Sequence, residues 1–307
     1  MTKAKKQHYV PQSYLSRFAR DKRLFAFDKN SRSSYPTNVG DIASERFFYD
    51  LPELDQLAGE AQSLEKFFHT FEQAGSEAIG RIIAAADNHD DAPIKEEDQI
   101  DLAIYLAVQF LRTKETRTLC IQTNELINKE LFLRDLEETH PELAKYRDAI
   151  SLETTREGKL ALHAQVLFDK DLRDEISEAL YLRSWILLKC GEREVLYTSD
   201  HPVVAHTGPQ SHTYSPRGLL SKASEVSIPL NSSYALLLVD PEFCPASVAQ
   251  QGTIQTMRTE NVIYQNHLQV LYSYQRVYCE ANDFSLADEM VSESPELGNP
   301  HFKRVIM

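Results

Sequence analysis

The chain lacks several features that mark whole classes of protein. None of its 307 residues lie in an apolar run of about 18, which argues against a membrane-spanning helix. Its basic N-terminus leads into no apolar segment of the kind that a secretion signal needs, so we predict a cytoplasmic protein. Glycine is scarce, with ten residues, and neither a GxxxxGK phosphate loop nor a dinucleotide fingerprint occurs. The four cysteines are too far apart for a zinc ribbon or a disulfide framework: Cys120, Cys190, Cys244 and Cys279.

Charge is distributed unevenly along the chain. The whole sequence carries a net charge of −13, yet residues 1–34 hold nine basic and two acidic side chains, which leaves −20 on the remaining 273 residues. A basic segment of this kind predicts one of two contacts. It could bind the phosphate backbone of a nucleic acid, or it could dock on the acidic body of its own chain or of a second copy. The sequence is thus compatible with nucleic acid as a partner and with an oligomer, and it predicts no membrane partner.

The hydrophobic periodicity predicts a single α+β domain spanning residues 1–307, in four consecutive parts. Residues 1–53 form a basic N-terminal segment with a small hairpin, and residues 54–182 form a helical middle with long central helices. Residues 183–280 are rich in strands with one helix, and residues 281–307 form an acidic tail. We expect the N-terminal and C-terminal strands to build a mostly antiparallel sheet.

Several individual elements follow from the same patterns. One long helix is expected from Glu96 to about Leu136, because three acidic residues at its start suit a helix N-terminus. Residues 185–188 and 194–198 read as a buried hairpin. The pattern further predicts a helix over 246–266 and a returning strand over 268–272.

The first candidate functional residue is His8, which opens the sequence His8-Tyr9-Val10-Pro11. Histidine is the side chain best suited to move a proton near neutral pH, and the Tyr9 phenol beside it could contact a substrate. The alternative is a purely structural hydrogen bond.

A polar sector lies on the central predicted helix. At 100° per residue, four side chains fall within a sector of about 60°: Tyr105, Gln109, Arg112 and Thr116. Neighbouring positions are apolar, which indicates a buried helix whose Gln109 and Arg112 need partners inside the fold or on a ligand. A buried arginine suits phosphate or carboxylate, and a structural salt bridge is the alternative.

Asp200 lies in the segment Thr198-Ser199-Asp200-His201-Pro202, directly after a predicted strand. Such junctions often carry catalytic carboxylates, although an Asx-turn closing the strand explains the pattern equally well. Because Mg²⁺ needs only one or two protein carboxylates, the sequence is compatible with no cofactor or with a magnesium ion at Asp200. Asn266, near the end of the last predicted helix, could fix a loop or contact a substrate.

Together, three motifs resemble a family of bacterial proteins, domain of unknown function 4238. They are HYVPQSYLSRF at the start, QFLRT beginning at Gln109, and TSDHP at 198–202. Trp185, Pro229 and Leu230 match two further strand motifs of the family, whereas His201 stands where asparagine is usual. The resemblance spans most of the chain. It implies no reaction, but it does imply that His8, Gln109, Arg112 and Asp200 belong together.

We therefore expect these side chains to line one pocket. In the leading hypothesis the protein is a nuclease-like hydrolase that acts on a phosphodiester, in bacterial defence. His8 would be the general acid or base, Arg112 would stabilise phosphoryl charge, and Asp200 would position His8 or hold Mg²⁺. The remaining residues would bind the substrate: Tyr9, Gln109, Tyr105, Thr116 and Asn266. In the alternative hypothesis the protein is a non-catalytic ligand-sensing or partner-binding module, whose polar cluster is structural and pairs Arg112 with Asp200.

Overall fold

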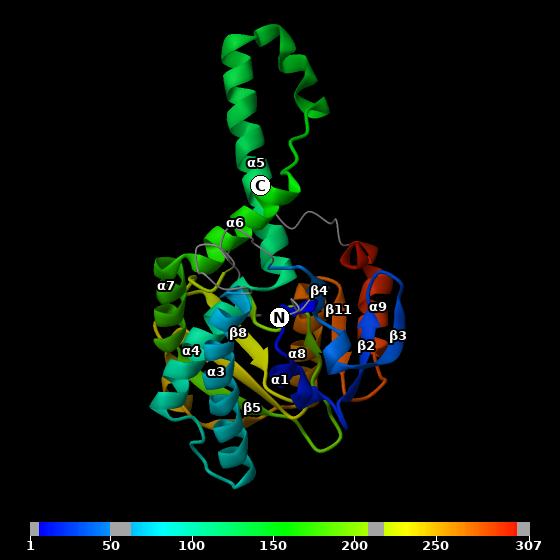
Figure 1. The fold of residues 1–307 in the computed structure, drawn as a ribbon. Coiled ribbons are helices and arrows are strands. Elements are labelled where there is room, and N and C mark those ends of the chain that lie inside the picture. Colours follow the sequence, from blue (N-terminus) through cyan, green and yellow to red (C-terminus); the bar gives the residue numbers. More distant parts are fainter. Residues whose placement is uncertain (1–5, 50–62, 208–217, 300–307) are drawn as a thin grey trace.

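The computed structural model describes residues 6–49, 63–207 and 218–299. Two sheets form the body (Figure 1). The four-stranded sheet, ordered β3-β2-β11-β6, is antiparallel throughout and joins strands from both ends of the chain. Its strands are β2 (Arg23–Asp28), β3 (Ser33–Asn38), β6 (Thr198–Ser199) and β11 (Arg276–Cys279). This confirms the expected α+β class and the sheet shared by N-terminal and C-terminal strands.

The five-stranded sheet, ordered β10-β5-β9-β8-β7, is antiparallel except for its β10–β5 pair. Its strands are β5 (Ser184–Lys189), β7 (Val204–Thr207), β8 (Ser224–Pro229), β9 (Tyr234–Val239) and β10 (Ile254–Thr256). A short ribbon of β1 (Lys6–His8) and β4 (Ser44–Arg46) holds the N-terminal segment.

Helices cover both sheets. The main core packs one face of the five-stranded sheet against three helices: α3 (Ser63–Asp87), α4 (Glu96–Leu111) and α7 (Lys170–Tyr181). Two further helices, α8 (Thr259–Tyr272) and α9 (Ser285–Glu293), pack on the other side of the sheets. Strand alternation sorts the side chains, since Leu236 and Leu238 of β9 enter the main core while Ala235 packs with Val262 of α8.

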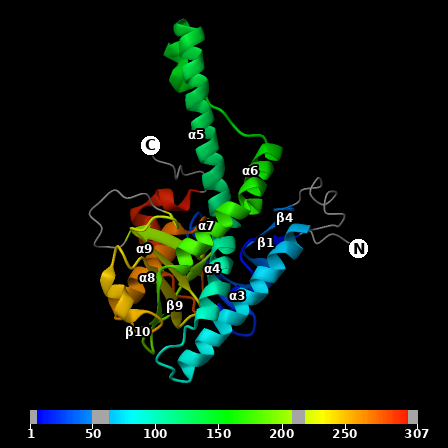
Figure 2. The same cartoon turned by 90° about the vertical axis from the view of Figure 1, so that its left-hand side faces the viewer.

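The remaining elements are short, apart from two helices at the top of the body. Helix α5 (Lys114–Thr139) projects away from the sheets, and α6 (Arg156–Phe168) leads the chain back (Figures 1 and 2). The short elements are α1 (Gln12–Leu15), η1 (Ser16–Phe18), η2 (Val39–Asp41), η3 (Pro141–Ala149), η4 (Pro245–Gln250) and η5 (Pro295–Gly298). Within the described ranges, no helix combines the length and the apolar character needed to cross a bilayer.

The structure corrects four of the expected elements. Strand β5 pairs with β9 and β10, whereas residues 194–198 lead into β6 of the other sheet. Residues 268–272 belong to α8, which begins only at Thr259 because β10 occupies part of the expected helix. The long helix expected from Glu96 divides where the Thr113 side chain caps a new helix, α5. The acidic tail includes α9, which packs Ala287 and Val291 into a core.

Candidate functional site: a polar clamp

The end of α4 holds the N-terminal segment by its backbone. Gln109 and Arg112 stand one helical turn apart, so their side chains leave the same face of α4. Gln109 Nε2 donates to the carbonyl oxygen of Tyr9 at 3.2 Å, and Arg112 Nη2 donates to that of His8 at 2.5 Å. Two residues three positions apart thus bind two successive carbonyl groups. In this chain, the QxxR spacing therefore serves to hold the backbone of the HY pair.

Arg112 is enclosed, with 3% of its surface exposed. Its Nη1 forms an ion pair with Glu72 of α3, and its guanidinium lies 4.4 Å from the centre of the Phe68 ring. The Tyr49 hydroxyl donates to the Arg112 carbonyl at 2.8 Å. Burial alone would lower the pKa of Arg112, but Tyr49 and Glu72 raise it above its ordinary value. The guanidinium is therefore permanently charged, and its charge is balanced inside the protein.

The third motif joins this cluster through hydroxyl groups. Thr113 follows Arg112 in the sequence, and its Oγ1 lies 2.7 Å from Nδ1 of His201. On the other side, the Tyr14 hydroxyl donates to the Pro229 carbonyl at 2.7 Å and lies 2.8 Å from Thr198 Oγ1. Segments from four distant parts of the sequence consequently meet within one hydrogen-bonded network.

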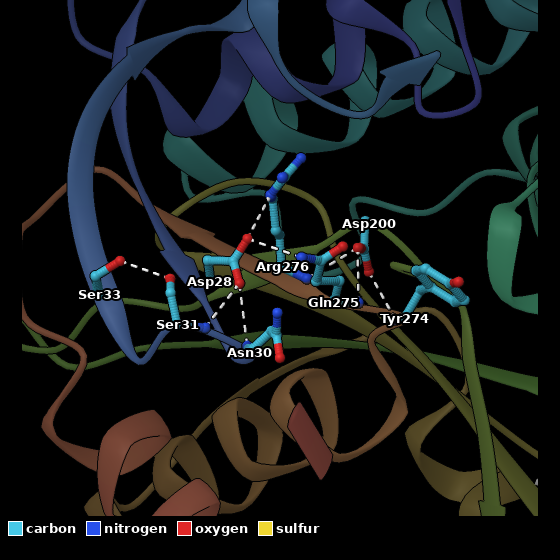
Figure 3. A network of polar contacts seen from close by, with 8 residues as sticks. All are labelled: Asp28, Asn30, Ser31, Ser33, Asp200, Tyr274, Gln275 and Arg276. Atoms are coloured by element: carbon cyan, nitrogen blue, oxygen red, sulfur yellow. Dashed lines mark hydrogen bonds and ion pairs between the residues drawn. The ribbon is translucent and has the colours of Figure 1, made fainter. Parts of the chain in front are cut away.

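Asp200 belongs to a separate part of the network (Figure 3). Its two carboxylate oxygens accept backbone N–H groups from Tyr274, Gln275 and Arg276 at 2.8 to 2.9 Å. Only 2% of the residue is exposed. Burial raises the pKa of Asp200, while Lys29 and the three N–H donors act in the opposite direction. The carboxylate therefore closes the distant turn from α8 into β11 and does not form the local Asx-turn considered from the sequence.

His8 is the most accessible of the four central residues. Its Nδ1 lies 3.4 Å from Gln12 Nε2, and its Nε2 has no hydrogen-bond partner among the described residues. Burial, followed by the charges of Lys6 and Arg112, lowers the pKa of His8, so the ring is neutral at pH 7. The Tyr9 ring beside it packs 5.2 Å from the Phe48 ring. Burial raises the pKa of Tyr9 well above its ordinary value, and the nearby Asp200 carboxylate adds to this shift.

Comparison with known proteins gives a family and no relative of known function. The family model described as "Protein of unknown function (DUF4238)" matches residues 6–283. The chain belongs to the DUF4238 family. No curated protein and no solved structure matches it. The matched range contains all the segments that meet in the polar clamp, which we define as His8, Tyr9, Gln109, Arg112, Thr113 and His201 with their partner Glu72.

The other predicted substrate-binding residues of this DUF4238 protein lie in different places. Tyr105 packs so closely on α3 that a side chain at Gly75 would overlap its ring. Thr116 donates to the carbonyl of Phe110 at 2.6 Å. The Asn266 amide accepts from Tyr197 N at 2.7 Å and donates to the Val195 carbonyl at 2.9 Å, which fixes the approach to β6. These side chains are occupied by the fold and do not face one common space.

Arg112 and Asp200 do not form the ion pair considered from the sequence. Among the described residues, the acidic partner of Arg112 is Glu72, and Asp200 is held by backbone N–H groups. The physical reason is placement, since α3 lies directly against α4 while Asp200 sits at the turn before β11. The described residues include no cluster of three or more His, Cys, Asp or Glu side chains arranged to hold a metal. A cation at Asp200 would also face the three N–H groups that now bind its carboxylate.

Most of the basic N-terminal segment is paired with the rest of the chain. Lys6 contacts Asp41 at 2.8 Å, Arg20 contacts Glu280 at 3.0 Å, and Arg32 contacts Asp288 at 2.8 Å. Lys29 is buried and donates to the carbonyls of Val270 and Ser273, at the C-terminal end of α8. Of the nine predicted phosphate-binding residues, Lys3 and Lys5 lie outside the described residues. The observed contacts are those of a basic segment docked on its own acidic body.

Sequence reasoning missed Glu72 of the clamp and two residues that support the clamp, Phe68 and Gln269. Glu72 and Phe68 stand one turn apart on α3, and both contact Arg112 from the same side. Gln269 of α8 accepts from Ser199 Oγ at 2.8 Å and donates to the Pro202 carbonyl at 3.0 Å, which fixes the TSDHP segment. A charged residue amid the apolar stripe of α3 was the available signal for Glu72. Nothing local in the sequence marks Gln269.

Proposed function

We propose that this protein is a non-catalytic partner-binding module whose polar clamp is structural. The observation that carries the proposal is that Arg112 and Asp200, the two charged groups that catalysis would need, are both saturated by groups of the chain itself. A phosphate would have to displace Glu72 and a backbone carbonyl from Arg112. Removing charged partners in a buried site is costly, which makes such a displacement unfavourable.

A binding role needs a surface outside the clamp. Two surface cavities lined by described residues lie elsewhere, one of 240 Å³ beside Arg32 and one of 270 Å³ beside Leu126 of α5. The second belongs to the projecting segment of residues 114–155, which we call the arm. The arm carries several exposed apolar side chains, and such groups mark interaction sites in soluble proteins. We therefore place the binding function on the arm.

A phosphodiester-acting enzyme is the second candidate, and one observation favours it. His8 is half-buried, neutral at pH 7 and lacks a partner for Nε2 among the described residues, as a general base would. In that case His8 would act with Arg112 as a distant electrostatic group, and the expected nuclease activity in bacterial defence would depend on the imidazole. The basic residues now paired at the surface would have to exchange their carboxylate partners for phosphates.

Two experiments separate these functions. A thermal-shift screen with inorganic phosphate, nucleotides, oligonucleotides and Mg²⁺ should leave the melting temperature unchanged if the module has no such ligand, because only binding to the native state stabilises it. If the protein is non-catalytic, the natural chain should cleave DNA and RNA no faster than the variant His8→Ala in nuclease assays. The matched control is His140→Ala, at an exposed histidine of the arm. Cleavage that persists in the control and disappears in His8→Ala would establish the enzyme instead.

A further inference from the structure

One face of the four-stranded sheet gathers three tyrosines and an arginine. Tyr278 of β11 lies opposite Ala26 of β2, and Ala26 lies opposite Tyr35 of β3, so the two tyrosines flank a small residue in one row. Arg276 precedes Tyr278 by two residues on β11, which places both side chains on the same face of the strand. Tyr9 of the N-terminal segment packs in the same core as Tyr278 and Ala26. The strand register thus brings three phenols and one guanidinium to one face.

The hydrogen-bond donors of this group lack acceptors in the described part of the chain. Tyr278 is completely buried, and its hydroxyl has no hydrogen-bond partner among the described residues. The hydroxyls of Tyr9 and Tyr35 form no hydrogen bond with a described residue either. Arg276 donates from Nε to Asp28 at 3.1 Å, and Figure 3 shows its outer nitrogens pointing away from that carboxylate. Because buried polar groups are normally paired, four neighbouring side chains in this state indicate an acceptor from outside the chain.

The two carboxylates beside the group cannot be that acceptor. Both oxygens of Asp28 accept hydrogen bonds, and the donors are Asn30, Ser31, Gln275 and Arg276. Asp200 is held by its three backbone N–H groups. Burial acts to lower the pKa of Arg276, but the neighbouring tyrosines and Asp28 raise it above its ordinary value. The guanidinium therefore stays charged, and its side chain is 35% exposed.

The chemistry of these donors favours a planar acceptor of low charge. The two Nη groups of an arginine match the two oxygens of a carboxylate, and phenol hydroxyls donate readily to the same oxygens. A phosphate group would also accept from these donors, but it brings up to two negative charges towards Asp28 and Asp200. Asp200 lies near the group, since it follows burial among the causes that raise the pKa of Tyr9. A single negative charge is therefore the better match.

We propose that Arg276, Tyr9 and Tyr35 bind the carboxylate group of a ligand on this face of the sheet, above the buried Tyr278. The carboxylate accepts from both Nη groups of Arg276 and from the two unpartnered hydroxyls. Two sources present this group, a free small acid and the C-terminus of a peptide. The site goes beyond the function proposed for the arm and does not depend on it, because none of these residues lies in the arm.

The first test measures the binding of acetate to the full-length protein by ligand-observed NMR, at constant ionic strength with chloride as the reference anion. We expect saturable binding to the natural chain and a dissociation constant at least about tenfold higher for Arg276→Gln. Arg20→Gln is the matched control, because Arg20 is an arginine of the body that pairs with Glu280 and is 80% exposed. It should bind acetate like the natural chain. Absence of saturable binding, or equal binding by Arg276→Gln, would overturn the proposal.

A second variant leaves the ion pair between Arg276 and Asp28 in place. Tyr35→Phe removes one hydroxyl group only, so the fold should be retained. Because one hydrogen bond is lost, we expect the dissociation constant for acetate to rise about twofold to tenfold. Tyr146→Phe, at an exposed tyrosine of the arm, should leave the binding of acetate unchanged. Equal binding by both tyrosine variants would reject the site.

Two further titrations examine the charge and the source of the ligand. Inorganic phosphate should bind more weakly than acetate, and tighter binding that depends on Arg276 would overturn the choice of a carboxylate. An acetylated trialanine peptide with a free C-terminus is then compared with its amidated form. Binding that is tighter than that of acetate and is lost on amidation would identify a peptide partner. Binding no tighter than that of acetate would identify a free small acid.

Discussion

The clamp and the arm place their side chains in opposite environments: the clamp buries polar groups, and the arm exposes apolar ones. In the clamp, charged and amide groups are buried, and most of their polar atoms have partners within the chain, with Gln109 Oε1 and His8 Nε2 as exceptions among the described residues. In the arm, several large apolar side chains are exposed. Buried polar groups are costly unless they are paired, whereas exposed apolar groups remain favourable targets for another surface. The comparison indicates that the clamp maintains the fold and that the arm is available for binding.

The largest expected effect is the loss of the clamp. Arg112→Ala would leave Glu72 and the His8 carbonyl without their partner in a nearly dry site, so we expect the free energy of unfolding to fall by about 3 to 5 kcal/mol. Urea denaturation of the variant would measure it.

Two further variants sharpen this result. Arg134→Ala removes an exposed arginine of the arm and should change the free energy by no more than about 0.5 kcal/mol. Glu72→Gln, combined with Arg112→Ala in a double-mutant cycle, should show strong coupling between the two residues. Additive effects would mean that the observed ion pair contributes nothing to stability.

A smaller effect should appear on acidification. His163 of α6 is buried beside Tyr49, and its Nε2 lies 3.0 Å from the Leu111 carbonyl. Burial lowers the pKa of His163 to about 3. Since the unfolded histidine binds a proton near pH 6.5 and the folded one does not, stability is complete above pH 6.5 and is lost as the pH falls toward 3. At pH 5 this single group should cost about 2 kcal/mol.

The variant His163→Gln isolates that contribution, because glutamine can still donate to the carbonyl but does not titrate. Denaturation between pH 7.5 and pH 5 should show a smaller loss of stability for His163→Gln than for the natural chain. His140→Gln, at an exposed site, should retain the full pH dependence. Equal losses in all three proteins would contradict the assignment.

The smallest effect is expected in the arm. Replacing Ile127 and Leu131 by serine removes exposed groups, so the free energy of unfolding, measured by urea denaturation at low protein concentration, should change by no more than about 0.5 kcal/mol per substitution. A larger loss, measured by denaturation under those conditions, would show that the arm contributes to the core and would weaken the contrast with the clamp.

Sequence patterns predicted the class of the fold better than its pairings. The apolar run at 234–239 and the alternation of polar and apolar residues at 23–28 are patterns typical of strands, and these residues form β9 and β2. The hairpin expected from residues 185–188 and 194–198 was wrong, because local pattern gives strand propensity but not the partner. The break before α5 was also missed. Thr113 can be recognised as a helix cap only if a new helix is already expected to begin after it.

For the candidate site, the sequence indicated which residues need partners but not which partners they find. Gln109 and Arg112 were expected to be buried from the apolar character of their helix, and they are. Their contacts are with backbone carbonyls of residues about a hundred positions away, and backbone groups have no sequence signature. The partners of Asp200 were not predictable for the same reason, because its carboxylate accepts hydrogen bonds from backbone N–H groups.

By itself, the sequence determined the α+β class, the family, the polar sector on α4 and the acidic character of the body, because these depend on composition, motif spacing and local periodicity. The tertiary structure alone decided that Arg112 binds Glu72, that Asp200 closes a backbone turn and that residues 114–155 stand away from the core. Such facts depend on which distant segments come together. That choice is made by packing and by the pairing of most buried polar groups, and neither is recorded in any single stretch of the chain.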